Sequence, residues 1–414
     1  MTAASSPTVF VSSVGEPLGS ARRGRAIALG AALLIGVNLR PSITSTAALL
    51  APAAERFDLT PTQTSLLATL PIIAFGVSAP IGPFLARRRG TAEALMWIML
   101  ALAGALVLRV TVPGGLLVGT FVAGLAIMAG GTLLPQYLKS LRASGLWIGL
   151  STMSFSAGAA IGAGLTVPVH ALTESPAVAL GAWALPAVLA AAAMALVARR
   201  RSAGAPPSVR VSVSSSSLTT VSFVTAMFGL QAMLFFAVAA WLPRMLGDRG
   251  VDPQTAGGLL ALVNVAGLVP TLLAPIAARR RRLLRALVPV LGAVMLGAFA
   301  WLSSGAGSPV AMAVTLGAVQ SAVFGLSLAL IVILAEDEAS AGLLSAVAQG
   351  VGYAFAGAGS LLVGILRDVT GSWTPSLVLM IGCALALSVI MGFVVRRHPV
   401  DLRVHADAPA SARA

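Results

Sequence analysis

Long apolar runs, separated by short polar or arginine-bearing breaks, make up most of the chain. A helix needs roughly 20 apolar residues to cross the hydrocarbon core of a bilayer, and about twelve such runs follow one another. This pattern predicts an all-α membrane protein with twelve transmembrane helices. We expect them near residues 26–50, 62–85, 91–111, 114–137, 144–170, 177–198, 218–243, 254–277, 283–303, 307–334, 340–366 and 374–395.

A break of different composition divides the predicted spans into two sets of six. Residues 199–217 contain Ala-Gly-Ala-Pro-Pro and four consecutive serines, which is typical of a flexible linker. The sequence therefore predicts two six-helix bundles flanked by tails. Their expected bounds are 1–24 for the N-terminal tail, 25–198 for the first bundle, 199–217 for the linker, 218–395 for the second bundle and 396–414 for the C-terminal tail.

The two predicted bundles resemble each other when one is shifted by about 193 residues. The matching pairs are Asn38 with Gln231, Pro83 with Pro275, and Gly158 with Gly352, at offsets of 193, 192 and 194. Internal repeats of this kind are typical of transporters built from two related bundles. We therefore expect a duplicated architecture with a site between its halves.

Composition agrees with a chain whose main solvent is lipid. Of its 414 residues, 57% are hydrophobic and 10% are charged. The net charge of +14 would also suit a nucleic-acid binder, but the basic residues gather in alternate breaks between spans. One side of the predicted topology collects 21 of the 27 Lys and Arg, at 22–25, 87–89, 139–142, 199–210, 279–285 and 396–413.

The positive-inside rule places this basic side in the cytoplasm. The sequence therefore predicts a bacterial inner-membrane protein with both termini in the cytoplasm and no nucleic-acid partner. Cys383 is the single cysteine, which excludes a disulfide framework. We find no nucleotide loop, metal-ligand spacing or catalytic cluster, so we expect neither a cofactor or metal nor an enzymatic activity.

Acidic residues and histidines are placed only in tails, loops and span ends. This holds in the predicted topology for all 13 acidic residues and for the three histidines. Proton-coupled carriers usually bury a carboxylate or histidine within the membrane. We therefore expect transport without a proton carried by the protein itself.

Arg40 is the one charge predicted deep within a span, about fourteen residues or roughly 21 Å along the first helix. The next residue, Pro41, removes a backbone hydrogen bond and should open the helix at that point. A permanent cation with no acidic partner in any span favours an anionic or strongly polar ligand. The alternative is that Arg40 ties helices together through carbonyl oxygens.

Other polar residues within the spans complete the candidate site. Arg109 lies near the outer end of the third span, where it could recruit solute or extend to the interface. Amides both donate and accept hydrogen bonds, so they could orient a ligand or join helices. Tyr353 follows Gln349 by four residues and shares its helix face. The predicted substrate-binding set is Asn38, Arg40, Arg109, Gln231, Gln349 and Tyr353.

Several short motifs point to a family. They are Asn38-Leu-Arg-Pro-Ser-Ile-Thr-Ser, Leu70-Pro-Ile-Ile-Ala-Phe-Gly, Trp183-Ala-Leu-Pro, Gln231 followed by Trp241-Leu-Pro, Leu344-Ser-Ala-Val-Ala-Gln-Gly-Val-Gly-Tyr and Asp368-Val-Thr-Gly-Ser-Trp. Over about 25–395 the chain resembles the major facilitator superfamily and, within it, the cyanate permease and 2-nitroimidazole transporter group. The resemblance implies alternating access around a central site. One departure is Ala86, where the superfamily usually has an aspartate before the arginine run.

These observations favour a secondary active or facilitative transporter for a small, anionic or polar, cyanate-like solute. We expect a monomer whose partners are the solute and the lipid bilayer. An alternative within transport is efflux or uptake of small uncharged heteroaromatics, with Arg40 in a structural role. The alternative of another class is a membrane receptor or channel; a receptor should carry a sizeable soluble domain, and a channel rarely needs two rocking halves.

Overall fold

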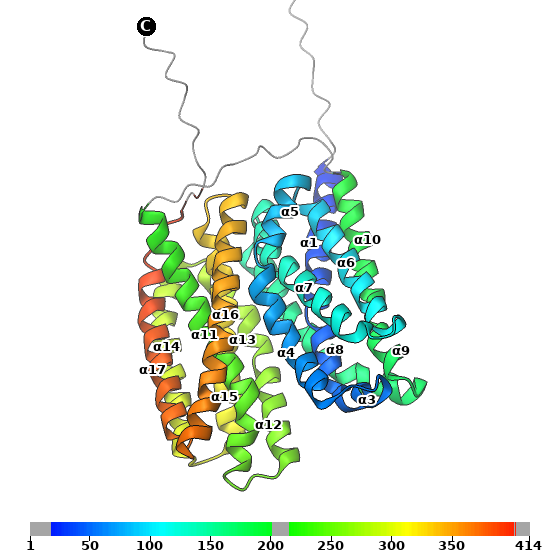
Figure 1. Ribbon diagram of the computed structural model, residues 1–414. Helices are drawn as coiled ribbons and strands as arrows, with labels where there is room; N and C mark the ends of the chain where they lie inside the picture. Colours follow the sequence, from blue (N-terminus) through cyan, green and yellow to red (C-terminus); the bar gives the residue numbers. More distant parts are fainter. Residues whose placement is uncertain (1–17, 201–214, 401, 403–414) are drawn as a thin grey trace, which may run out of the picture.

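The computed structural model describes residues 18–200, 215–400 and 402, and is helical almost throughout (Figure 1). The first half contains α1 (Leu18–Asn38), α2 (Pro41–Ala48), α3 (Leu50–Arg56), α4 (Pro61–Ser78), α5 (Ile81–Arg89), α6 (Thr91–Thr111), α7 (Gly115–Ser140), α8 (Gly145–Thr173), α9 (Pro176–Gly181) and α10 (Ala184–Arg200). The second half contains α11 (Ser215–Gly247), α12 (Pro253–Ala266), α13 (Leu268–Ala278), α14 (Arg281–Ser304), α15 (Pro309–Leu334), α16 (Glu338–Thr370) and α17 (Thr374–Val394).

These helices match the twelve predicted spans. Within the described residues, 11 helices are long and apolar enough to cross a membrane. The remaining predicted span, 62–85, is formed by α4 and α5, which meet at Pro80. Some predicted spans consist of two or three helices because proline or glycine interrupts them. The predicted tails and linker fall partly on residues 1–17, 201–214, 401 and 403–414, outside the described residues.

The first span is broken beside Arg40, as the sequence predicts. Helix α1 ends at Asn38 and α2 begins at Pro41, because proline lacks the N–H that a continuous helix would use. The chain tightens here, with the Leu39 N–H donating to the Gly36 carbonyl at 3.2 Å. Arg40 becomes the residue that caps α2, which places a cationic side chain at a helix break.

The two halves repeat one packing arrangement. In the first half α8 approaches α1 so closely that a Cβ on Gly158 would lie 2.1 Å from the Val37 carbonyl oxygen. In the second half α16 approaches α11 at the corresponding place, where a Cβ on Gly352 would lie 3.3 Å from the Gly229 Cα. Small residues allow such close helix contacts in membranes. The equivalent positions support the predicted duplication.

The halves pack against each other near one end of the molecule. We call it the arginine-rich end: α5 finishes there with Arg87, Arg88 and Arg89, and α14 begins there at Arg281. Figure 1 shows the first half on the right and the second half on the left, with α5 near the top. Glycines Gly145 and Gly149 of α8 contact α13 at this end. The opposite end carries α3 and α9.

The first residues after α17 pack onto this end, although the sequence predicts a tail from residue 396. The Val400 N–H donates to the Leu334 carbonyl at 2.7 Å, and the Glu336 N–H donates to the Val400 carbonyl at 3.1 Å. The Leu402 N–H donates to the Ser340 hydroxyl at 2.9 Å. Val400 and Leu402 therefore lie beside the loop between α15 and α16 and the start of α16.

Candidate functional site

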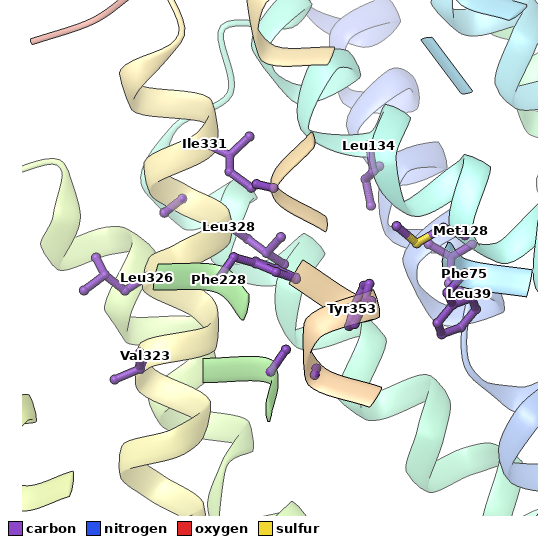
Figure 2. Close-up of a cluster of buried hydrophobic side chains, with 14 of the residues drawn as sticks. Leu39, Phe75, Met128, Leu134, Phe228, Val323, Leu326, Leu328, Ile331 and Tyr353 are labelled. Atoms are coloured by element: carbon purple, nitrogen blue, oxygen red, sulfur yellow. The ribbon is translucent and has the colours of Figure 1, made fainter. Parts of the chain in front are cut away.

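Arg40 lies at the α1–α2 break with a partly buried side chain. Its backbone carbonyl is fully used, because it accepts the N–H groups of Ile43 and Thr44 at 3.0 and 3.1 Å. Its guanidinium has no hydrogen bond or ion pair to any residue that the structure describes. The preceding residue, Leu39, lies beside Phe75 (Figure 2), and the ring centroid of Phe75 is 5.6 Å from that of Tyr353 in the other half. Arg40 is therefore a cation with unused donors, set between the two halves.

Tyr353 is the centre of a group of aromatic rings drawn from both halves. Its ring centroid lies 5.6 Å from Phe75 of α4, 5.1 Å from Phe228 and 6.0 Å from Phe236, both of α11. In Figure 2 the Tyr353 ring lies between those of Phe228 and Phe75, with Leu39 beside Phe75. The Tyr353 hydroxyl makes no hydrogen bond within the described part of the chain. We call Phe75, Phe228, Phe236 and Tyr353 the aromatic cluster.

Gln349 joins the halves through its amide. The side-chain nitrogen donates to the Gly131 carbonyl of α7 at 3.2 Å and to the Ser345 hydroxyl at 2.7 Å. The side chain is buried. Gln349 and Tyr353 come from the same stretch of α16, as predicted, but the Gln349 amide is used between helices.

Asn38 and Gln231 also donate to backbone carbonyls. The Asn38 amide donates to Leu34 at 2.8 Å and to Pro186 of α10 at 3.2 Å. Gln231 of α11 donates to the Gln320 carbonyl of α15 at 3.5 Å, and the Gln320 amide donates back to Leu234 at 3.3 Å. These contacts brace neighbouring helices within each half.

Arg109 occupies a different environment from Arg40. Its side chain is 0% exposed, so the guanidinium does not extend to the membrane interface. It donates to the Ser42 carbonyl at 3.1 Å, the Thr46 hydroxyl at 3.2 Å and the Leu180 carbonyl at 2.7 Å. A Cβ on Gly119 would lie 2.4 Å from the Arg109 Cβ, so α7 covers this side chain closely. The contacts tie α6 to α2 and α9.

A polar contact at the arginine-rich end was not among the sequence-based candidates. Thr91, at the start of α6, donates its hydroxyl to the Glu338 carboxylate at the start of α16. Gln136 of α7 donates to the Thr91 hydroxyl at 3.2 Å. Arg279, the residue after α13, donates to the Ala143 carbonyl between α7 and α8. These residues come from both halves, so they close this end; the sequence indicates only that Glu338 lies at a span end.

An ion-pair group at the opposite end joins the end of α11 to the turn between α16 and α17. Asp248 accepts from the Arg367 guanidinium at 2.9 Å and from the Trp373 indole at 2.8 Å. Both hydrogen bonds lower the pKa of the Asp248 carboxyl, and the one from Arg367 has the larger effect. Arg244 pairs with Asp368 beside it, at 3.2 Å.

Comparison with known proteins identifies relatives along most of the chain. The family model described as Major Facilitator Superfamily matches residues 30–357. The "uncharacterized transporter YycB" of Bacillus subtilis is 31% identical over 370 residues, which cover 86% of this chain and 90% of that protein. In Escherichia coli, the 2-nitroimidazole transporter is 28% identical and the cyanate transport protein CynX 29% identical. Both matches cover 86% of this chain. They cover 92% of the 2-nitroimidazole transporter and 94% of CynX.

Solved structures share the fold at low sequence identity. The proton:xylose symporter XylE is similar with a TM-score of 0.68 and 13% identity, covering 90% of this chain and 96% of that one. FucP in the outward conformation gives a TM-score of 0.66 and 13% identity, covering 88% and 98%. A bacterial homologue of the iron transporter ferroportin, in an outward-facing state, has a TM-score of 0.68 and 14% sequence identity. The match covers 89% of this chain and 100% of that one. At these identities the likeness concerns the fold alone.

Proposed function

Because the chain belongs to the Major Facilitator Superfamily, a family of membrane transporters, we propose that it carries a small anionic solute with Arg40 as the electrostatic anchor. The observation that carries this proposal is the Arg40 guanidinium at a helix break, without a hydrogen bond or ion pair to the described residues, one residue from the Leu39 that lies beside Phe75 of the aromatic cluster (Figure 2). The cyanate transport protein among the relatives agrees with a compact anionic solute.

The energetic argument begins with the cost of a charge within the membrane. An arginine near the bilayer centre costs a few kcal/mol on insertion scales, and Arg109 offsets this cost with three acceptors. Arg40 has no such acceptors among the described residues. A bound anion would supply them, because a guanidinium fork fits a planar anionic group with two parallel hydrogen bonds.

Alternating access follows from where the halves meet. Glu338, Thr91 and Arg279 close the arginine-rich end in this structure. Arg40 belongs to the first half and Tyr353 to the second, so a solute touching both can stabilise an arrangement in which the halves move together. Such a ligand shifts a conformational equilibrium only by its difference in affinity for the two states.

We further propose exchange, or entry with a co-ion, as the driving mode. The acidic residues of α6 and α16 lie at the ends of these helices: Glu93 and Glu338 in the first turns, and Asp368 near the end of α16. A lone anion would enter against an inside-negative potential of roughly 2.3 kcal/mol per charge per 100 mV. Counterflow between equal pools of solute avoids this cost. It should therefore persist without ion gradients, and its pH dependence should follow the solute.

The arginine-rich end is proposed to face the cytoplasm of a bacterial inner membrane, because positive residues are retained on that side. In a Cys383→Ala background, Ser304→Cys at the opposite end should react with an impermeant thiol reagent on intact cells. Arg282→Cys should react only after permeabilisation; both positions are exposed. The reverse pattern of labelling would overturn this orientation.

The anchor is tested by binding and then by counterflow. Purified protein is screened by thermal shift against cyanate, formate, acetate and benzoate, because a ligand that binds the folded state raises its apparent stability. We expect at least one anion to stabilise the wild type and to lose about tenfold in affinity, or roughly 1.4 kcal/mol, with Arg40→Gln and Arg40→Lys. Arg56→Gln, an exposed arginine of α3, is the matched control.

Counterflow of the stabilising anion in proteoliposomes should fail with both Arg40 variants and persist with Arg56→Gln. Wild-type counterflow by Arg40→Gln would contradict the anchor.

A second function is favoured by the aromatic cluster, namely transport of an uncharged heteroaromatic such as the 2-nitroimidazole of one relative. It predicts that 2-nitroimidazole counterflow survives Arg40→Gln.

A further inference from the structure

We infer that the preferred solute is a planar aromatic or heteroaromatic monoanion, with an aromatic carboxylate as the simplest example. The aromatic cluster would select its body while Arg40 binds its charge. This inference rests on the proposed function and narrows it to a substrate class. Three observations carry it: the small number of free polar groups, the rings around Tyr353, and the division of these groups between the halves.

The polar groups left for a ligand are few. The amides of Asn38, Gln231 and Gln349 all donate to backbone carbonyls, so they already serve the protein. A polyol such as a sugar needs many matched hydrogen bonds, since unpaired polar groups lose binding energy when buried. Within the predicted binding set, Arg40 and Tyr353 are the residues whose side chains make no hydrogen bond to any described residue. They suit a solute with one polar end.

Aromatic rings lie close to the helix break that carries Arg40, because Leu39, the residue before it, lies beside Phe75 (Figure 2). Tyr353 meets Phe228 edge to face, with an interplanar angle of 89°, and meets Phe236 at 71°. Phe236 is partly exposed, so its ring is the member of the cluster most accessible to a solute. Aromatic rings prefer edge-to-face or offset partners because their faces are negative and their edges positive. A planar ring presented by a solute can take part in the same arrangement.

Charge and shape together separate the candidate solutes. A linear three-atom ion such as cyanate can neutralise Arg40 but covers little of the aromatic cluster. A neutral heteroaromatic covers the rings but leaves the Arg40 guanidinium without an acceptor, which is costly in a dehydrated site. An aromatic monoanion satisfies both. A carboxylic acid with a saturated ring can pair with Arg40 and has a similar size, but it cannot make edge-to-face contacts with the aromatic cluster.

The experiment compares four ligands on the purified full-length protein by calorimetry or thermal shift. Benzoate carries the ring and the charge, cyclohexanecarboxylate the charge on a saturated ring, benzamide the ring without the charge, and cyanate the charge without a ring. We expect benzoate to bind at least about fivefold more tightly than cyclohexanecarboxylate, a ratio of the size that aromatic pairs produce. Benzamide and cyanate should bind more weakly than benzoate.

Variants assign these differences to residues. Phe236→Leu should bring the affinity ratio of benzoate to cyclohexanecarboxylate close to one, whereas Arg40→Gln should weaken both acids equally. Phe393→Leu, on the exposed face of α17, is the matched control and should leave the ratio unchanged. Size-exclusion chromatography and thermal unfolding verify that each variant is folded.

Two failures can be told apart. If both acids depend on Arg40 but bind equally well to the wild type, or if cyanate binds more tightly than benzoate, the aromatic inference is overturned while the anion proposal stands. If no acid depends on Arg40, the proposed function fails as well. The four ligands are compared on the wild-type protein, so this comparison tests the inference even if the Phe236→Leu variant folds poorly.

Discussion

Replacing Arg109 by methionine should destabilise the protein without acting at the solute site. The side chain is completely buried and donates three hydrogen bonds, to Ser42, Thr46 and Leu180. Hydrogen bonds from charged groups contribute about 1.5–3 kcal/mol each. The gain from no longer burying a cation, several kcal/mol in magnitude, offsets much of this loss. The Ser42 carbonyl keeps a donor, because the Thr46 hydroxyl also bonds to it at 2.8 Å.

The net loss should therefore be about 2–4 kcal/mol, arising mainly at the Leu180 carbonyl. We expect the melting temperature in detergent to fall by about 5–10 °C, measured by intrinsic fluorescence, with Arg109→Lys also destabilised because an ammonium cannot reproduce the guanidinium fork. Arg40→Gln is the comparison and should melt within about 2 °C of the wild type, since its guanidinium makes no such bonds. If Arg109→Met melted like the wild type but lost counterflow, Arg109 would belong to the solute pathway and the structural assignment would be refuted.

Three further outcomes can be measured. Gly158→Ala should cost about 1–3 kcal/mol in thermal unfolding because its Cβ meets the α1 backbone, whereas Gly164→Ala on the same helix meets nothing within 4 Å and should be neutral. Glu338→Gln should weaken closure of the arginine-rich end and raise thiol labelling of Ser151→Cys in a cysteine-free background; unchanged labelling would count against this closure. The lowered pKa of Asp248 means that its ionised form contributes stability at neutral pH, which is lost as the pH falls below the ordinary aspartate pKa of 3.8. The melting temperatures of the wild type and Asp248→Asn should therefore converge in acid, and a constant difference would exclude the linkage.

The helices could be predicted because their signals are local. An apolar run long enough to cross the bilayer gives a span, and Pro41 gives the break beside Arg40, whatever packs around them. The repeat was also visible, since Gly158 and Gly352 stand at equivalent places where only a small side chain fits. The interruption at Gly267 between α12 and α13 was not predicted, because the apolar run continues through it.

The roles of polar side chains could not be predicted in the same way, because their partners are distant in the sequence. Gln349 bonds to Gly131, 218 residues away, and Glu338 bonds to Thr91, 247 residues away. An amide facing the centre of a bundle looks the same in the sequence whether a carbonyl or a solute accepts from it. The aromatic cluster is likewise tertiary, since Phe75 meets Tyr353 only when the halves assemble.

Arg40 and Arg109 differ in the feature that should separate a binding arginine, as proposed for Arg40, from a structural one. Both lie on helices that span the membrane, and both could serve an anion by charge alone. The difference is the supply of acceptors: both terminal nitrogens of Arg109 donate to acceptors within the first half and only its Nε is left unpaired. The Arg40 guanidinium, at the boundary with the second half, has no acceptor among the described residues.

This placement has a consequence for mechanism, because a ligand drives a conformational change only if it binds the two states with different affinity. A solute that contacted Arg40 alone would belong to one half, and moving the other half would leave its binding energy nearly unchanged. A solute whose ring also meets Phe236 and Tyr353 gains that energy only when the halves are suitably placed. The contact between an aromatic solute and these rings would therefore both select the substrate and couple the movements of the two halves. Phe236→Leu should then reduce counterflow of benzoate more than counterflow of cyclohexanecarboxylate.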